Sequence, residues 1–147
     1  MTIDIYKRVN GEHHPLSNFA PFPSRYMSVA PTAEHCFQAA KFMGFPSNAG
    51  HIAAIFAALT PSAAKKLGKS RKHPIDPCWD NVRVAVMEHV LRNKLLLNPE
   101  VRAALGATGQ EQIVEGSPWD YFWGTGKSGK GRNELGKLWM KIRDEGA

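Results

Sequence analysis

Glu34 is the carboxylate whose neighbours in the sequence best suit chemistry. It opens the run Glu-His-Cys-Phe-Gln-Ala-Ala-Lys-Phe, which ends at Phe42. In a helix, which advances about 100° per residue, Glu34, Gln38 and Lys41 share one face. A carboxylate in such a place can activate water or stabilise a positive charge. The same residues also fit a simpler role, in which Glu34 complements the helix dipole and Lys41 is solvated.

The segment 77–97 places charged residues on the apolar side of a long helix. Five residues fall within one sector of about 80°: Asp80, Arg83, Met87, Leu91 and Lys94. A buried cation needs a carboxylate or a bound anion as its partner. Two interpretations stay open at this point. One is an internal network, with Asp80 paired to Arg83 and Lys94 reaching the surface, and the other is an anion-binding site.

The run from Glu115 to Asn133 is a basic, glycine-rich loop that begins with aromatic residues. It contains Gly-Lys-Ser and a literal GxGxxG. The first glycine of a phosphate loop is missing at the required distance, and no strand precedes either pattern, so we reject both as nucleotide fingerprints. Aromatic faces beside cations and backbone N–H groups suit a planar heterocycle that carries a phosphate. Asp120, three residues after Ser117, also fits a capping box.

Neither a metal site nor a cofactor is expected. The histidines have no ligand spacing of the HExxH type, and Cys36 and Cys78 belong to no CxxC motif. The simplest interpretation of both cysteines is a free, buried thiol. Carboxylate chemistry at Glu34 needs no metal or redox group.

Length and composition predict one soluble domain. The chain has 147 residues, 43% of them hydrophobic and 22% charged, which excludes disordered and fibrous classes. Since no apolar run approaches the roughly 20 residues of a membrane span and no secretory signal opens the chain, we expect a cytoplasmic protein without a membrane partner. The net charge of +6 favours an anionic partner, either a phosphorylated small molecule or a nucleic acid.

Four capping residues followed directly by proline predict a mainly helical α+β fold. They are Thr60, Asp76, Asn98 and Ser117, and each combination is typical of a helix start. Short strands are expected at 3–9 and 26–29. Helices are expected at 33–43, 48–58, 61–67, 77–97, 99–107 and 134–144, with a short turn at 118–121. The helix 77–97 should be central, because apolar residues cover much of its circumference.

Taken in order, the motifs resemble those of the YbiA/NADAR family. They begin with Pro-Leu-Ser-Asn-Phe at 15–19 and the Glu34 run, continue with Trp79-Asp80, Leu-Arg-Asn-Lys at 91–94 and Asn98-Pro99, and end with Asp-Tyr-Phe-Trp-Gly at 120–124 and Gly-Lys-Gly-Arg-Asn-Glu-Leu-Gly at 129–136. The resemblance spans about Pro15 to Arg143 and implies a single small, mainly helical YbiA-like domain over 1–147. One departure bears on phosphate recognition: the Arg and the acid that relatives usually carry just before the Trp-Asp pair are absent here.

The resemblance implies an N-glycosidase. Its expected reaction is hydrolysis of the bond between a phosphorylated ribose and a base-like amine, as in the ribosylaminopyrimidine intermediates of riboflavin synthesis. Glu34 is the expected catalytic carboxylate and Asp120 the alternative or second acid. The expected substrate-binding residues are Asn18, Phe19, Lys41, Trp79, Lys94, Trp123, Gly124 and Asn133.

Two other functions remain open from the sequence. One is an ADP-ribosyl hydrolase that removes ADP-ribose from a modified base in DNA or RNA, which would make a nucleic acid or another ADP-ribosyl compound the partner. The other is a binding module for ADP-ribose without catalysis, against which the presence of Glu34 in its motif argues.

Overall fold

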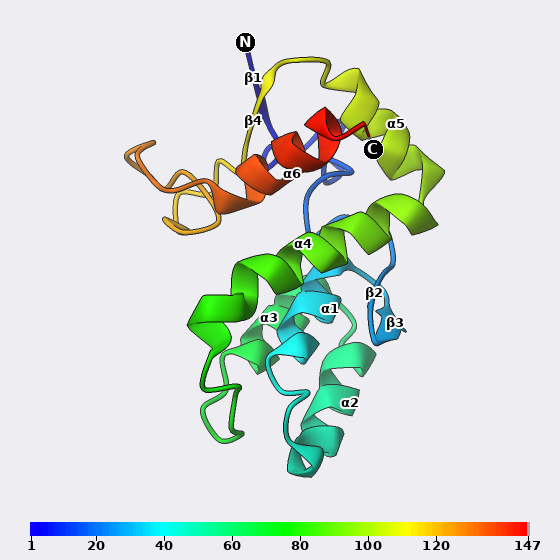
Figure 1. The fold of residues 1–147 in the computed structure, drawn as a ribbon, viewed down its shortest axis with the longest axis vertical. Coiled ribbons are helices and arrows are strands. Elements are labelled where there is room, and N and C mark those ends of the chain that lie inside the picture. Colours follow the sequence, from blue (N-terminus) through cyan, green and yellow to red (C-terminus); the bar gives the residue numbers. More distant parts are fainter. Residues whose placement is uncertain (147) are drawn as a thin grey trace. The chain divides into compact units, whose positions relative to one another are not determined.

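The computed structural model describes residues 1–146, which form two compact units. Residues 21–97 make up one, here called the central unit, and residues 1–20 together with 98–146 make up the other, the terminal unit. Each unit contains its own helices and a pair of short strands (Figure 1). The prediction of a mainly helical fold with short strands is confirmed.

The central unit is built around one buried helix, α1 (Ala33–Ala40), every residue of which is buried. Helices α2 (Ala49–Ala57), α3 (Pro61–Gly68) and α4 (Trp79–Leu97) pack against it, and the 3-10 helix η1 (Pro46–Asn48) leads into α2 (Figure 1). Strands β2 (Ser24–Tyr26) and β3 (Ser28–Ala30) form an antiparallel hairpin that also contacts α1.

Local capping explains where α1 and α3 begin. The hydroxyl of Thr32 accepts a hydrogen bond from the backbone N–H of His35 at 3.2 Å, and Thr60 does the same for Ala63 at 3.0 Å. These side chains satisfy N–H groups that the first turn of a helix leaves without partners. The expected end of the first helix at residue 43 is wrong, since α1 ends at Ala40. The side-chain amide of Asn48 binds the carbonyl of Phe42 there and holds a turn.

Helix α4 begins two residues later than the predicted start at Pro77. Asp76 accounts for the difference, because its carboxylate accepts the N–H of Cys78 at 2.8 Å and its carbonyl accepts that of Trp79 at 2.9 Å. The apolar stripe is also narrower than predicted. Leu96 lies on the opposite side of the helix from Val90 and Leu91, and 70% of its surface is exposed.

The terminal unit joins the two ends of the chain. Strand β1 (Thr2–Asp4) pairs in parallel with β4 (Gln112–Val114), with Ile3 opposite Ile113. Helix α6 (Glu134–Asp144) packs on β4 and on α5 (Pro99–Ala107), and both helices have the predicted bounds. The predicted strand 3–9 is shorter than expected. Strand β4 was not predicted, since three residues carry too little alternation to reveal a strand.

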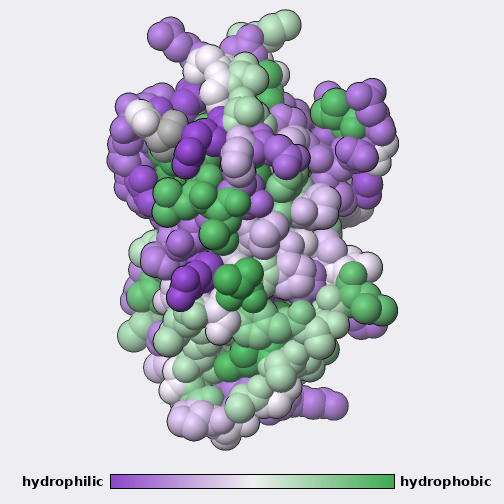
Figure 2. All heavy atoms as spheres, turned by 90° about the vertical axis from the view of Figure 1, so that its right-hand side faces the viewer, coloured by the Kyte–Doolittle hydropathy of each residue, from purple (hydrophilic) through white to green (hydrophobic). Residues whose placement is uncertain are grey.

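The surface of the central unit is apolar along α2. The outer face of α2 exposes Ala53, Ala54 and Ala57, and the surface in the lower part of Figure 2 is accordingly largely apolar. Of the two free cysteines, Cys36 is buried as predicted whereas Cys78 is exposed. Among residues 1–146, no helix is both long and apolar enough to cross a membrane.

Candidate active site

The Glu34 carboxylate lies in the interior at the first turn of α1, where only 7% of the residue is exposed. One turn later, the side-chain amide of Gln38 donates a hydrogen bond from Nε2 to Oε2 of Glu34 at 2.5 Å. A solvated, dipole-complementing role would leave this carboxylate at the surface. Its burial therefore favours the chemical role over the simpler one.

Lys41, the C-cap of α1, follows on the same face as Glu34 and Gln38, and the Glu34 charge acts on its ammonium. Its ammonium donates to the carbonyl of Gly68 at 3.3 Å. Burial lowers the pKa of Lys41 below its ordinary value, and the Glu34 carboxylate opposes that shift. The predicted sharing of one face by Glu34, Gln38 and Lys41 thus brings the three groups into one cluster.

Three further cations act on Lys41. Burial is the main cause of its lowered pKa, and repulsion from Arg71, Lys69 and Lys65 adds to that effect. Such a cluster suits a phosphate group. Sequence reasoning missed these three residues, although a signal was present: residues 35–75 contain no Asp or Glu.

Lys94, on α4, is completely buried, and burial lowers its pKa to about 7. Lys94 therefore does not reach the surface, and the interpretation in which it extends out of an internal ion-pair network to solvent is wrong. Burial thus favours the neutral form of Lys94 far more than that of a solvated lysine. Lys94 can consequently exchange a proton near pH 7, and it offers an anion less positive charge than a solvated lysine does.

Trp79 stands at the start of α4 with 8% of its surface exposed. Its ring packs against Phe37 of α1, with centroids 5.3 Å apart and an angle of 48° between the planes. This contact anchors the N-terminal end of α4 beside the helix that carries Glu34. A stacking role toward a substrate base stays a prediction.

His35 adjoins Glu34 in the sequence and has a structural role. Its Nε2 lies 2.9 Å from the carbonyl of Ala58, and its Nδ1 lies 2.8 Å from the hydroxyl of Thr32. Because the carbonyl can only accept, Nε2 carries the proton and Nδ1 accepts from the hydroxyl. His35 thus ties the start of α1 to the end of α2.

In the terminal unit, Asp120 organises the loop 115–133. Its Oδ1 accepts the backbone N–H of Trp123 at 2.7 Å and that of Phe122 at 3.0 Å. The capping box expected from the sequence is wrong, because the Ser117 N–H binds the Glu115 carboxylate at 3.1 Å and Asp120 instead accepts the N–H groups that follow it. The carboxylate is thus already engaged in holding backbone, which favours Glu34 as the main catalytic carboxylate.

Gly124 and Asn133 hold the same loop together. A Cβ on Gly124 would come within 2.7 Å of the carbonyl of Glu115. The Asn133 amide donates to the carbonyl of Ile113 at 3.0 Å and accepts the N–H of Glu115 at 2.9 Å. Both residues were predicted to bind substrate. The contacts described above are to backbone, so any substrate contact would come in addition to a structural role.

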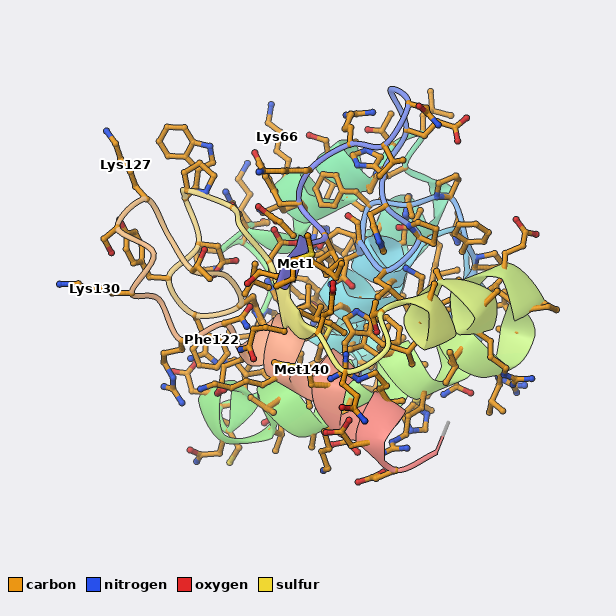
Figure 3. The ribbon with its side chains drawn as sticks, turned by 90° about the horizontal axis from the view of Figure 1, so that it is seen from above. Met1, Lys66, Phe122, Lys127, Lys130 and Met140 are labelled. Carbon is orange, nitrogen blue, oxygen red and sulfur yellow. The ribbon has the colours of Figure 1, made fainter. Side chains whose placement is uncertain are left out.

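The aromatic residues of the loop pack against one another, whereas its lysines extend into solvent. The rings of Phe122 and Trp123 meet edge to face at 4.8 Å, and the Arg132 guanidinium lies 4.8 Å from the Phe122 centroid. Lys127 and Lys130 extend away from the loop into solvent, whereas Phe122 lies at its base (Figure 3). Half-buried Trp123 remains a candidate for stacking.

Asn18 and Phe19 lie in a turn of the terminal unit, ahead of β2 in the sequence. Asn18 is buried and Phe19 half-buried, and the Phe19 ring meets His13 edge to face at 5.9 Å. The structure thus divides the predicted residues by unit. The central unit contains Glu34, Lys41, Trp79 and Lys94, and the terminal unit contains Asn18, Phe19, Asp120, Trp123, Gly124 and Asn133.

Comparison with known proteins identifies the family. The NADAR domain matches residues 5–145. The chain belongs to the NADAR family. An N-glycosidase of Nostoc punctiforme, Npun_R5314, is 38% identical over 146 residues, which cover 99% of this chain and 92% of that protein. As a NADAR protein with such relatives, the chain is an N-glycosidase.

Two further relatives extend the comparison of this NADAR protein. N-glycosidase YbiA of Escherichia coli K12 is 34% identical over 145 residues, which cover 98% of this chain and 88% of that one. The NMR structure of the E. coli protein YbiA matches with a TM-score of 0.83 over 98% of this chain and 83% of that chain. A riboflavin biosynthesis protein of Vibrio vulnificus, VVA0006, is 34% identical over 143 residues, 96% of this chain and 38% of that protein.

Proposed function

We propose that this N-glycosidase hydrolyses the bond between a phosphorylated ribose and a base-like amine, with a ribosylaminopyrimidine phosphate of riboflavin synthesis as its substrate. The observation that carries the proposal is the buried carboxylate of Glu34 beside a cluster of cations. The name of the Vibrio vulnificus relative supports the choice of pathway.

In the proposed reaction, the bond between the ribose C1 and the base nitrogen breaks as positive charge develops on the ribose. The Glu34 carboxylate stabilises that charge and accepts a proton from the attacking water, whose oxygen forms the new bond to C1. The departing nitrogen takes up a proton from solvent, and Glu34 later returns the proton it accepted to solvent, so that one water is added across the bond overall. Asp120 is the proposed alternative or second acid.

The substrate phosphate is assigned to Lys41 together with Lys65, Lys69 and Arg71. Mutual repulsion among these cations is relieved when a dianion binds between them. The assignment is supported by their shared effect on the Lys41 ammonium. It also compensates for the Arg that relatives usually carry before the Trp79 position.

Replacement of Glu34 by Gln tests the catalytic assignment. Glu34→Gln keeps the size of the side chain and removes its charge, so we expect turnover to fall by about 10²-fold or more. Glu100→Gln is the matched control, because Glu100 is an exposed acid in the first turn of α5. Both variants lose a helix-dipole contribution of about 0.3–1 kcal/mol, and only the first should lose activity.

The outcome also assigns the role of Asp120. If Glu34→Gln stays within about tenfold of the parent rate while Asp120→Asn is inactive, the catalytic role moves to Asp120. If both variants remain active, the site proposed here is wrong.

The second candidate function is removal of ADP-ribose from a modified base in DNA or RNA. The charge of the segment 35–75 favours this second function. The segment contains six Lys and Arg residues and no Asp or Glu, which is more positive charge than a single phosphate group requires. Rates on a free ribosylaminopyrimidine phosphate and on an ADP-ribosylated oligonucleotide decide between the two. A third alternative, a binding module without catalysis, predicts no turnover of either substrate but retained ADP-ribose binding.

A further inference from the structure

The side-chain amide of Gln38 uses its N–H group and leaves its oxygen without a hydrogen bond. Its Nε2 donates to Glu34, while its Oε1 is buried and has no hydrogen-bond partner among residues 1–146. A buried amide with an unsatisfied oxygen is less favourable than an apolar side chain of the same size. A requirement for fold stability alone would therefore favour Met or Leu at this position.

Gly68, the last residue of α3, provides the space that Gln38 occupies. A Cβ at Gly68 would collide with Oε1 and Cδ of Gln38. Gly68 is helical and needs no left-handed backbone, so its lack of a side chain serves close approach rather than conformation. By contrast, a Cβ on Gly50 in α2 would meet nothing within 4 Å.

Lys41 ties the same two helices together one turn further along. Its ammonium binds the carbonyl of Gly68, while its charge acts on Glu34. The end of α3 therefore contacts α1 through both Gln38 and Lys41. Gly68 thus contacts both Gln38 in α1 and Lys41 at the C-terminal end of that helix.

We propose that Gln38 is a positioning residue that orients the Glu34 carboxylate, and that position 68 is a glycine because the Gln38 side chain must lie against its backbone. The inference rests on the proposed catalytic role of Glu34. The N–H of Gln38 stabilises the charged carboxylate and selects one orientation for it.

Gln38→Met is the first test, because Met has a similar length and no N–H group. We expect kcat to fall by about tenfold to 10²-fold with KM changed little. The acid limb of the pH–rate profile should move to higher pH, since the carboxylate loses a donor that favours its charged form. The charged groups that act on Lys41, namely Glu34, Lys65, Lys69 and Arg71, are unchanged in this variant. Thermal stability should be equal or higher.

Gly68→Ala is the second test, with Gly50→Ala as its matched control. The new Cβ should displace Gln38 and lower kcat as Gln38→Met does, whereas Gly50→Ala, also in a helix, should keep the parent rate. The double variant Gln38→Met with Gly68→Ala should lose little more than either single variant, because both act through one contact.

The outcomes separate this inference from the proposed function. If Glu34→Gln is inactive but Gln38→Met keeps the parent kcat and pH profile, the positioning role is overturned. If Gly68→Ala keeps the parent rate, or if the two losses add fully, the explanation for the glycine is overturned. If Glu34→Gln itself remains active, the proposed function has failed, whatever the Gln38 variants do.

Discussion

At the scale of single residues, the chain keeps several polar groups in its interior. Glu34, Gln38 and Lys94 each have less than a tenth of their surface exposed. Such groups reduce stability unless their partners compensate, and active sites are the usual place where proteins accept that cost. Burial thus distinguishes Glu34, Gln38 and Lys94 from Lys69 and Arg71, which are exposed.

Lys94 makes stability depend on pH in a defined window. Its pKa is about 7 in the folded chain and near its ordinary value of 10.5 when unfolded. Between these values the unfolded state binds more protons, so stability should rise with pH from 7 to 10 by at most on the order of 1 kcal/mol per unit. Urea unfolding at several pH values measures the slope. We expect Lys94→Met to flatten it and the exposed-residue control Lys66→Met to leave it unchanged.

At the scale of elements, contacts between side chains and backbone hold α2 and the segment after α3 together. The rings of His51 and His73 stack at 4.1 Å with 15° between their planes, and His51 binds the carbonyl of Leu67 at 3.1 Å. Burial first, and His73 second, lower the pKa of His51 below 6.5. The segment that carries Lys69 and Arg71 is therefore held best when His51 is neutral.

Acid should weaken this packing. Because the pKa of His51 is lower in the folded state, its contribution is present above about pH 6.5 and is lost as the pH falls through the folded value. We expect His73→Gln to reduce the loss of thermal stability between pH 7 and pH 5. His89→Gln, at an exposed histidine of α4, is the control. An identical acid response in all three proteins would contradict the role of the stacked pair.

The loop 115–133 is held by its own backbone contacts. Besides the Asp120 carboxylate, the pairs Thr125–Glu115 and Gly126–Ser117 are joined by backbone hydrogen bonds of 2.8 and 3.1 Å. We expect Gly124→Ala to lower the melting temperature, because its Cβ would press on the Glu115 and Asp120 carbonyls. Gly106→Ala in α5 is the control, because a Cβ at Gly106 would meet nothing within 4 Å. Equal melting temperatures would contradict the close approach.

At the scale of the whole molecule, the activity should not depend on a metal ion. No group of three or more His, Cys, Asp or Glu side chains within residues 1–146 could hold one. We expect turnover to survive EDTA, since the carboxylate mechanism uses none. Loss of activity on chelation, restored by a divalent ion, would contradict the mechanism.

We also predict that the chain unfolds in one cooperative transition. The terminal unit needs both ends of the chain, because β1 pairs with β4. Each unit alone is small for an independent hydrophobic core. Two separate transitions in calorimetry would show that the units unfold independently and would contradict the prediction of a single domain.

The local sequence determined much of the secondary structure. Capping residues with proline located the starts of α3 and α5, and helical periodicity placed Glu34, Gln38 and Lys41 on one face. These features depend on residues within one or two turns, which a single sequence displays directly. The boundaries that were wrong, at the end of α1 and the start of α4, depend on Asn48 and Asp76, whose side chains bind the backbone of Phe42 and Cys78 inside the expected helices.

Only the tertiary structure decided which polar groups are buried and what they contact. Sequence spacing left Glu34 between a solvated and a catalytic role, and Lys94 between the surface and the interior. It could not reveal that Gly68 makes room for Gln38, or that β4 pairs with β1 from the other end of the chain. Burial and close approach are properties of segments distant in sequence, so they arise only when those segments pack.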